Sequence, residues 1–183
     1  MRLYQKLGCD LLEFNEVLID KHLSLRQLTT FDVSQQYLSW LHDRYVNKFL
    51  VAGLNPPNLA QQIQYVQECL ESTDRILLGI FTVNNDFIGT LKLTIKNMCN
   101  AEIGIMIGDL NHQGKGYGKL AINLVKDWAL RNKIIQLEAG YFIDNLISSK
   151  LFQSCGFIEY ERNVFPLNEG NTTVEIRVRF KFE

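Results

Sequence analysis

A glycine-rich segment near the middle of the chain constrains the fold more than any other part of the sequence. It reads Gln-Gly-Lys-Gly-Tyr-Gly-Lys over residues 113–119, after an apolar stretch at 101–107 and before a segment with helical periodicity. Glycines adopt backbone conformations that other residues avoid, so such a turn can point several N–H groups inward at the start of a helix. Backbone donors and the helix dipole together favour a phosphate or pyrophosphate at that position.

Two common phosphate-binding motifs do not fit this segment. A Walker A loop has four residues between its first glycine and a Gly-Lys-Ser/Thr ending, and dinucleotide-binding loops run G-x-G-x-x-G. Here the glycines run G-x-G-x-G, and Lys115 and Lys119 add positive charge. The segment therefore predicts a phosphate site of another type, and the alternative is a tight strand-to-helix turn that binds nothing.

Hydrophobic periodicity predicts a mixed α/β (α+β) domain in which a mostly antiparallel sheet is flanked by helices. Helices are expected after a cap at Thr29, Thr30, Asp32 or Ser34, after Asn58, over about 116–131, and from a cap at Asp144 or Asn145 to a stop at Gly156. The predicted strands are 22–28, 76–83, 87–95, 101–107, 134–142, 157–165 and 173–180. The three central strands should form an antiparallel meander.

The last predicted strand alternates apolar residues with charged ones. Its charged positions are Glu175, Arg177, Arg179 and Lys181. We expect an edge strand, whose charges either pair with a second copy of the chain or prevent such pairing.

Size and charge predict one domain over residues 22–183, preceded by an N-terminal extension at 1–21. The chain has 183 residues and a net charge of -1, so it can bury a core, and it lacks the basic excess of a nucleic-acid surface. Widely spaced cysteines and histidines do not indicate a metal site. Because no signal peptide or membrane-length apolar stretch is recognised, we expect a cytoplasmic monomer or homodimer that does not contact membranes.

Two sequence patterns resemble the GNAT superfamily of N-acetyltransferases. Q-x-x-G-x-G from Gln113, at the start of an amphipathic helix after a meander, is similar to its acetyl-CoA motif. Asn145-x-x-Ser148, followed by Cys-Gly-Phe at 155–157, is similar to a second signature. Residues 37–48 also resemble a subgroup that includes ribosomal-protein N-terminal acetyltransferases and polysaccharide amino-sugar acetyltransferases. The resemblance extends over about 22–183.

The resemblance implies a splayed strand pair that holds acetyl-CoA, the acyl donor. The backbone of residues 105–107 would bind the pantetheine arm, since an extended amide chain can pair like a strand. The segment 113–119 would hold the pyrophosphate, and Asn145 would meet the cofactor from the other side. The residues implied for the cofactor are Ile105, Met106, Ile107, Gln113, Gly114, Lys115, Gly116, Tyr117, Gly118, Lys119 and Asn145.

Acetyl transfer to an amine also requires proton transfers at the nitrogen and the sulfur. Several family members carry a carboxylate placed like Glu102, and apolar neighbours are expected to raise its pKa so that it acts as a base. A solvated strand glutamate is the alternative. Phe152 stands where many members have a proton-donating tyrosine, so Ser148, Ser149 or water would protonate the thiolate. Tyr141 and Cys155 are lesser candidates, and Cys155 also suits a small core position.

The acceptor pocket is expected near Tyr37 and Trp40, although both aromatic residues also suit a hydrophobic core. The favoured function is direct acetyl transfer from acetyl-CoA to a primary amine. The amine could belong to an amino-sugar nucleotide, a protein N-terminus or a small molecule. The alternatives are a non-catalytic acyl-CoA-binding module, which Phe152 favours and Glu102 opposes, and an unrelated nucleotide-binding protein.

Overall fold

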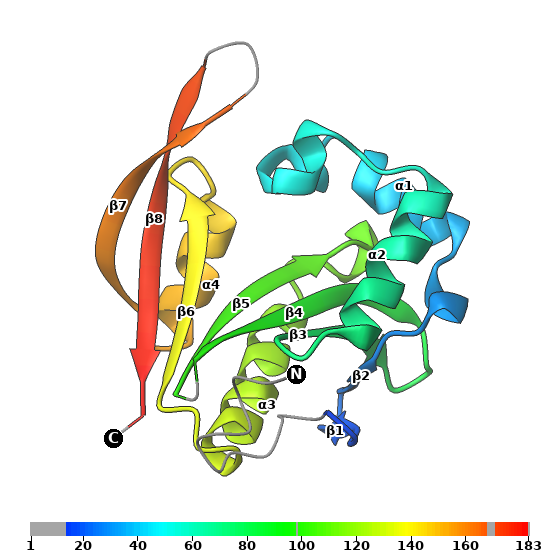
Figure 1. The fold of residues 1–183 in the computed structure, drawn as a ribbon, viewed down its shortest axis with the longest axis horizontal. Helices are drawn as coiled ribbons and strands as arrows, with labels where there is room; N and C mark the ends of the chain where they lie inside the picture. Colours follow the sequence, from blue (N-terminus) through cyan, green and yellow to red (C-terminus); the bar gives the residue numbers. More distant parts are fainter. Residues whose placement is uncertain (1–13, 98, 168–170, 183) are drawn as a thin grey trace.

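A computed structural model describes residues 14–97, 99–167 and 171–182, in which a single sheet lies between two pairs of helices (Figure 1). The strands are β1 (Leu18–Ile19), β2 (Leu23–Gln27), β3 (Arg75–Thr82), β4 (Phe87–Asn97), β5 (Asn100–Ile107), β6 (Gln136–Phe142), β7 (Ile158–Pro166) and β8 (Thr172–Lys181). The helices are α1 (Gln35–His42), α2 (Leu59–Glu71), α3 (Tyr117–Arg131) and α4 (Leu146–Ser154). The predicted α+β class and the antiparallel meander are confirmed. None of the described helices is long and apolar enough to cross a membrane.

The sheet divides into two parts at its one parallel strand pair. Its strand order is β1-β2-β3-β4-β5-β6-β8-β7, and every neighbouring pair except β5–β6 is antiparallel. The β5–β6 pairing runs only from Asn100 opposite Gln136 to Ile103 opposite Ala139. Beyond these residues both strands continue but diverge, as Figure 1 shows.

The two helix pairs cover opposite faces of the sheet. Because strand residues point alternately to the two faces, Leu91 and Ile103 belong to the core under α3 and α4. Leu77 and Met106 belong to a smaller core with residues of α1 and α2. The same alternation directs Lys92 of β4 toward the α1 and α2 side.

The predicted helix boundaries have the expected local causes. Of the four candidate caps for the first helix, Ser34 caps α1, and Asn58 caps α2; each accepts a hydrogen bond from the backbone N–H three residues later. Asn145 caps α4 in the same way. Gly156, with a φ of 81°, follows the end of α4 in a left-handed conformation.

The prediction of an edge position for the last strand is wrong. Strand β8 lies between β6 and β7, and β7 forms the edge. Alternation of charged and apolar residues indicates two different faces, but it does not distinguish an internal strand from an edge strand. The charged side chains of β8 therefore lie on one face of the sheet, flanked by side chains of β6 and β7.

Part of the predicted N-terminal extension joins the sheet. Leu18 and Ile19 pair with β2, and the ring of Phe14 lies 5.5 Å from that of Trp128 on α3. Residues 1–13 of the extension, including Cys9, lie outside the described residues.

Candidate functional site

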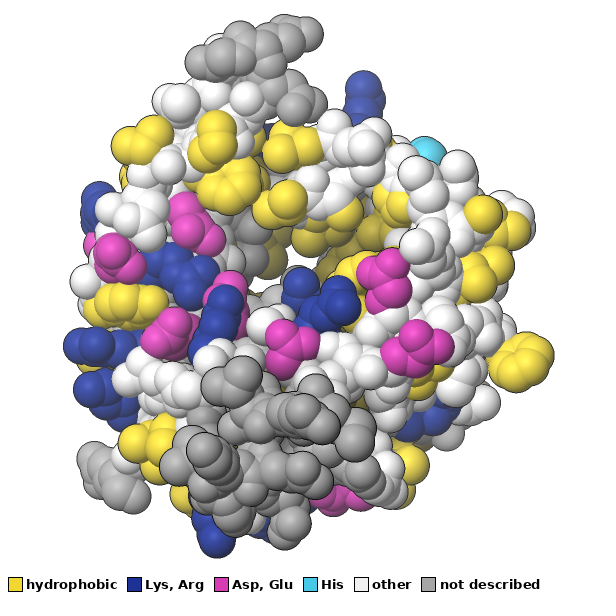
Figure 2. All heavy atoms as spheres, viewed as in Figure 1, with side chains coloured by type: hydrophobic (Ala, Val, Ile, Leu, Met, Phe, Trp, Pro, Cys, Tyr) yellow, Lys and Arg dark blue, Asp and Glu magenta, His cyan; other side chains and the backbone are white. Residues whose placement is uncertain are grey.

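A cavity of about 560 Å³ lies where β5 and β6 diverge. Its walls come from both arms of the divided sheet, from α4, and from α1, α2 and the loop between them. The lining residues from β5, from β6 and from α4 with its cap are Ile103, Gly104, Ile105, Met106, Gly140, Tyr141, Asn145, Ser148 and Phe152. Figure 2 shows the molecule hollowed between its two halves, with apolar side chains around one end and acidic and basic side chains along the other.

The far half of β5 has a free side. Residues from Gly104 to Ile107 pair with β4, but they have no partner on β6. Alternate residues of a strand direct their N–H and C=O groups to each side. The groups on the free side can therefore pair with an extended ligand that contains amides.

The glycine-rich segment forms the predicted connection from strand to helix. Gly114 and Gly116 have φ values of 71° and 87°, and Gly116 is the residue before the first turn of α3. A Cβ atom at either position would meet no other protein atom within 4 Å. Backbone conformation, and not packing, therefore requires these two glycines. The Gln113 side chain donates a 2.8 Å hydrogen bond to the carbonyl oxygen of Ile107, which fastens the turn to the end of β5.

The remaining residues of this segment have different environments. Lys115 and Lys119 are exposed, so both ammonium groups are available to an anion. The ring of Tyr117 contacts His112 edge-on, with centroids 5.6 Å apart. Gly118 is buried, and a Cβ atom there would lie 3.2 Å from the Leu151 side chain, so this glycine also allows close packing of α3 on α4.

The start of α4 brings polar groups to the cavity. The Asn145 side-chain oxygen accepts a 3.0 Å hydrogen bond from the Ser148 N–H, and both residues line the cavity. Phe152 also lines it and stacks on Tyr141, with centroids 6.1 Å apart. The Tyr141 hydroxyl lies 3.4 Å from Ser149 Oγ, to which it donates a hydrogen bond. Ser148 and Tyr141 thus supply hydroxyl groups beside an apolar ring.

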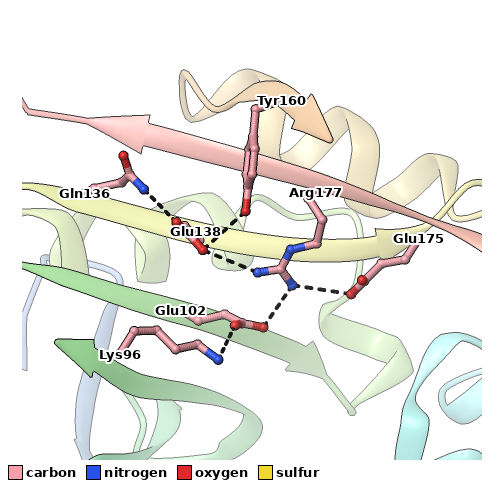
Figure 3. A network of polar contacts seen from close by, with 7 residues as sticks. All are labelled: Lys96, Glu102, Gln136, Glu138, Tyr160, Glu175 and Arg177. Carbon is pink, nitrogen blue, oxygen red and sulfur yellow. Dashed lines mark hydrogen bonds and ion pairs between the residues drawn. The ribbon is translucent and has the colours of Figure 1, made fainter. Parts of the chain in front are cut away.

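Glu102 lies in an ionic network that joins β5 to β8 (Figure 3). Its carboxylate accepts a 3.1 Å hydrogen bond from Arg177 and lies 2.8 Å from the Lys96 ammonium. Burial raises the pKa of Glu102, but the hydrogen bonds from Arg177 and Lys96 outweigh burial and lower this pKa to about 2. The prediction of a raised pKa is therefore wrong, because it considered only apolar sequence neighbours.

Arg177 is the centre of this network, and sequence reasoning did not identify it. Its guanidinium lies 3.4 Å from a Glu175 oxygen and 3.5 Å from a Glu138 oxygen, in addition to its contact with Glu102. A side chain at Gly140 would collide with Glu175 and Arg177. The glycine thus lets Arg177 cross β6 and tie the two sheet halves together near the last β5–β6 pair. The glycine at position 140 within a predicted strand was the sequence signal that a side chain could cross there.

The two predicted acceptor-pocket aromatics lie in different places. Tyr37 is buried, lines the cavity and hydrogen-bonds with Thr90 and Gln62. Burial raises the pKa of Tyr37 to about 12, so its hydroxyl stays protonated. Trp40 is absent from the cavity lining; its ring packs 5.1 Å from that of Phe87, within the core under α1 and α2.

Sequence reasoning also missed several polar residues that line the cavity. Gln62, Tyr65, Thr90 and Lys92 do so from α2 and β4. Thr90 and Lys92 occupy alternate positions of one strand and therefore share a face. Polar residues on one face of a half-buried strand were the sequence signal for a polar cavity wall.

Comparison with known proteins matches most of the chain to one family. A family model described as the acetyltransferase (GNAT) domain matches residues 22–158. An uncharacterized protein of Methanocaldococcus jannaschii is 27% identical over 140 residues, or 75% of this chain. The chain spans 28% of the length of that curated relative.

Solved structures with the same fold include two acetyltransferases bound to coenzyme A. A spermidine N-acetyltransferase from Vibrio cholerae, in complex with CoA and spermine, has a TM-score of 0.77 and 19% identity, covering 88% of this chain and 96% of that one. A ribosomal L7/L12 alpha-N-protein acetyltransferase in complex with coenzyme A has a TM-score of 0.78 and 16% identity, covering 91% and 98% respectively. At these identities the likeness concerns the fold.

Proposed function

This chain belongs to the GNAT acetyltransferase family, and from that premise we propose that it transfers an acetyl group from acetyl-CoA directly to a primary amine. The observation that carries the proposal is the position of the cavity. It opens where β5 and β6 stop pairing after Ile103, and β5 then leads through the glycine-rich turn into α3. A ligand with an extended amide arm and a pyrophosphate matches both features.

The donor would lie along the free side of β5. Backbone groups of Ile105, Met106 and Ile107 would pair with the pantetheine amides, and the turn over 113–119 would hold the pyrophosphate. Free backbone N–H groups, the positive end of the α3 dipole and two exposed lysines all favour an anion there. Asn145 would meet the arm from α4; its side-chain oxygen is occupied by the helix cap, so its amide N–H groups would donate to the arm.

The transfer exchanges one bond for another. The amine nitrogen attacks the thioester carbonyl, the C–N bond forms, and the C–S bond breaks to release coenzyme A as a thiolate. The nitrogen loses a proton and the sulfur gains one. A hydroxyl group of Ser148 or Tyr141 would give the sulfur its proton. A thiolate is a good leaving group, so this proton transfer contributes less than positioning does.

Glu102 has a different role in this proposal from that of a strong base. A carboxylate with a pKa of about 2 binds protons weakly, so it is a poor acceptor for the proton of an ammonium group. Its negative charge would instead attract the amine and orient a water molecule that takes the proton. The positive charges of Arg177 and Lys96 keep it ionised at neutral pH.

The acceptor would be an amino-sugar nucleotide or a protein N-terminus, as the resemblance over residues 37–48 suggests. The similar solved structures act on spermidine and on a ribosomal protein, by their names. The cavity borders α1, α2 and their connecting loop, which is where the acceptor would enter.

A thermal-unfolding titration with acetyl-CoA, coenzyme A and ATP tests donor binding. A ligand that binds only the folded state stabilises it by about 2.7 kcal/mol at one hundred times its Kd. We expect shifts with acetyl-CoA and coenzyme A but not with ATP. The variant Gln113→Ala should show a smaller shift because the turn loses its bond to Ile107, whereas Gln67→Ala, an exposed change on α2, should match the wild type.

Turnover with a panel of amines tests the transfer itself. Acetylation of any primary amine, with equal release of coenzyme A, supports the enzyme. Binding of acetyl-CoA without acetylation of any amine would favour the non-catalytic acyl-CoA-binding module, for which Phe152 in the cavity is the relevant observation. If neither acetyl-CoA nor coenzyme A stabilises the protein at millimolar concentration, the glycine-rich segment is only a tight turn and the proposal is wrong.

A further inference from the structure

The cavity has an unusual distribution of charge for a site that takes an amine. Lys92 is the only charged side chain among the described residues that line it. The nearby carboxylates of Glu102, Glu138 and Glu175 are not part of the lining, and all three lie within 3.5 Å of Arg177. Lys92 therefore places the one charge on the described cavity lining itself, whereas the three carboxylates lie outside the lining and share one guanidinium.

Lys92 lies at the place where the sheet divides. It is opposite Gly104, the first residue of β5 beyond the β5–β6 pairing, and its side chain is half-buried on the α1 and α2 face. In the described part of the chain Lys92 forms no ion pair, unlike Lys96, which pairs with Glu102. An anionic ligand group in the cavity could therefore pair with the Lys92 ammonium without displacing a protein carboxylate.

The rest of the polar lining is neutral. Tyr37 and Gln62 are buried, and together with Tyr65 and Thr90 they present hydroxyl and amide groups toward the cavity. These groups can hydrogen-bond with a polar acceptor, but they do not neutralise a second ammonium group. A polyamine in this cavity would meet Lys92 and no lining carboxylate.

We propose that the acceptor is an amine that also carries an anionic group, a carboxylate or a phosphate, and that Lys92 binds this group. The inference rests on the proposed acetyl transfer and narrows its acceptor. The Lys92 charge has a second consequence, because a nearby positive charge disfavours the ammonium form of the acceptor. A larger share of the bound amine is then neutral and able to attack the thioester.

Matched pairs of acceptors test the inference with acetyl-CoA held constant. Serine against serinamide isolates a carboxylate, glucosamine 6-phosphate against glucosamine isolates a phosphate, and spermidine represents polyamines. We expect kcat/KM for the anionic member of at least one pair to exceed that of its neutral partner by about tenfold or more, the usual scale of a charge-assisted contact. Which pair shows the preference identifies the anionic group.

Variants at Lys92 connect this preference to one side chain. Lys92→Met should abolish the preference, so that the ratio of the two kcat/KM values within the discriminating pair falls to about one, whatever change in rate the two members share. Lys92→Arg should retain most of the preference. Lys21→Met removes the same charge from an exposed turn between β1 and β2 and should change neither rate.

Each outcome separates this inference from the proposed function. Turnover in which neutral amines or spermidine match or exceed the anionic members overturns the inference and leaves the acetyltransferase proposal intact. If no amine is acetylated, calorimetric titration of the same compounds into the protein–coenzyme A complex tests whether Lys92 binds the anionic group. Binding of an anionic member that Lys92→Met weakens by about tenfold supports the anion site without catalysis, and equal or absent binding overturns it.

Discussion

Removal of the Arg177 guanidinium should destabilise the protein and change how its stability depends on pH. In Arg177→Met, three carboxylates that each lie within 3.5 Å of the guanidinium lose their shared partner. Loss of one member of a fully buried ion pair costs about 3–5 kcal/mol. The Arg177 side chain is 13% exposed and that of Glu102 is 27% exposed, so water reduces the cost. We expect a loss of about 2–3 kcal/mol in the free energy of unfolding at pH 7.

The pH dependence follows from the pKa of Glu102, about 2 in the folded protein against an ordinary value of 4.5. Because the folded-state pKa is lower than the unfolded one, the ionised group stabilises the fold fully above about pH 5, and this contribution is lost as the pH falls toward 2. At about 1.4 kcal/mol per pKa unit, the wild type should lose roughly 3 kcal/mol from this group over that range. In Arg177→Met the loss should be much smaller, because burial then raises the pKa of Glu102 and only Lys96 opposes it.

Urea unfolding at pH 7 and at pH 3, followed by circular dichroism, measures both effects. The double variant Arg177→Met/Glu102→Gln should recover part of the loss at pH 7, since it removes an uncompensated carboxylate. Arg162→Met is the matched control, because Arg162 pairs with Glu159 on the exposed edge strand and should leave unfolding unchanged. If Arg177→Met unfolds like the wild type at both pH values, the network does not stabilise the sheet as argued.

Five further substitutions test the site and its surroundings. Gly116→Ala should cost about 1–2 kcal/mol in unfolding free energy, because its φ is 87°, and should weaken acetyl-CoA binding in a titration; unchanged binding would argue against the turn as the phosphate site. Gly140→Ala should cost about 1–3 kcal/mol in urea unfolding by displacing the Arg177 side chain, and a stable variant would contradict that packing. Glu102→Gln should lower kcat/KM without moving the pH–rate profile between pH 5 and 8, since the pKa of Glu102 is about 2; a shifted limb would identify it as the titrating base. Tyr141→Phe and Ser148→Ala each remove one candidate proton donor to the thiolate. The variant that removes the actual donor should lower kcat by about tenfold or more, and unchanged kcat in both would favour water as the donor.

The features that the sequence determined by itself depend on interactions between near neighbours. The caps at Ser34, Asn58 and Asn145, the stop at Gly156 and the strand-to-helix turn at 113–119 each involve groups within a few residues. Strand and helix periodicities are also local, because they follow from the geometry of one element. These features were sufficient to predict the elements, the meander and the phosphate-type turn.

The features that only the tertiary structure decided depend on residues distant in the sequence. The apolar sequence neighbours of Glu102 suggested a raised carboxylate pKa. The hydrogen bond from Arg177, which lies 75 positions later in the chain, instead helps to lower this pKa. The internal position of β8 depends on which strands pair, and alternation carries no information on pairing. From the sequence, Lys92 is an ordinary exposed strand residue. Only the tertiary structure shows that β5 and β6 diverge beside it. The energy of a charge depends on the charges and the water within a few ångströms, and chain topology alone determines which these are.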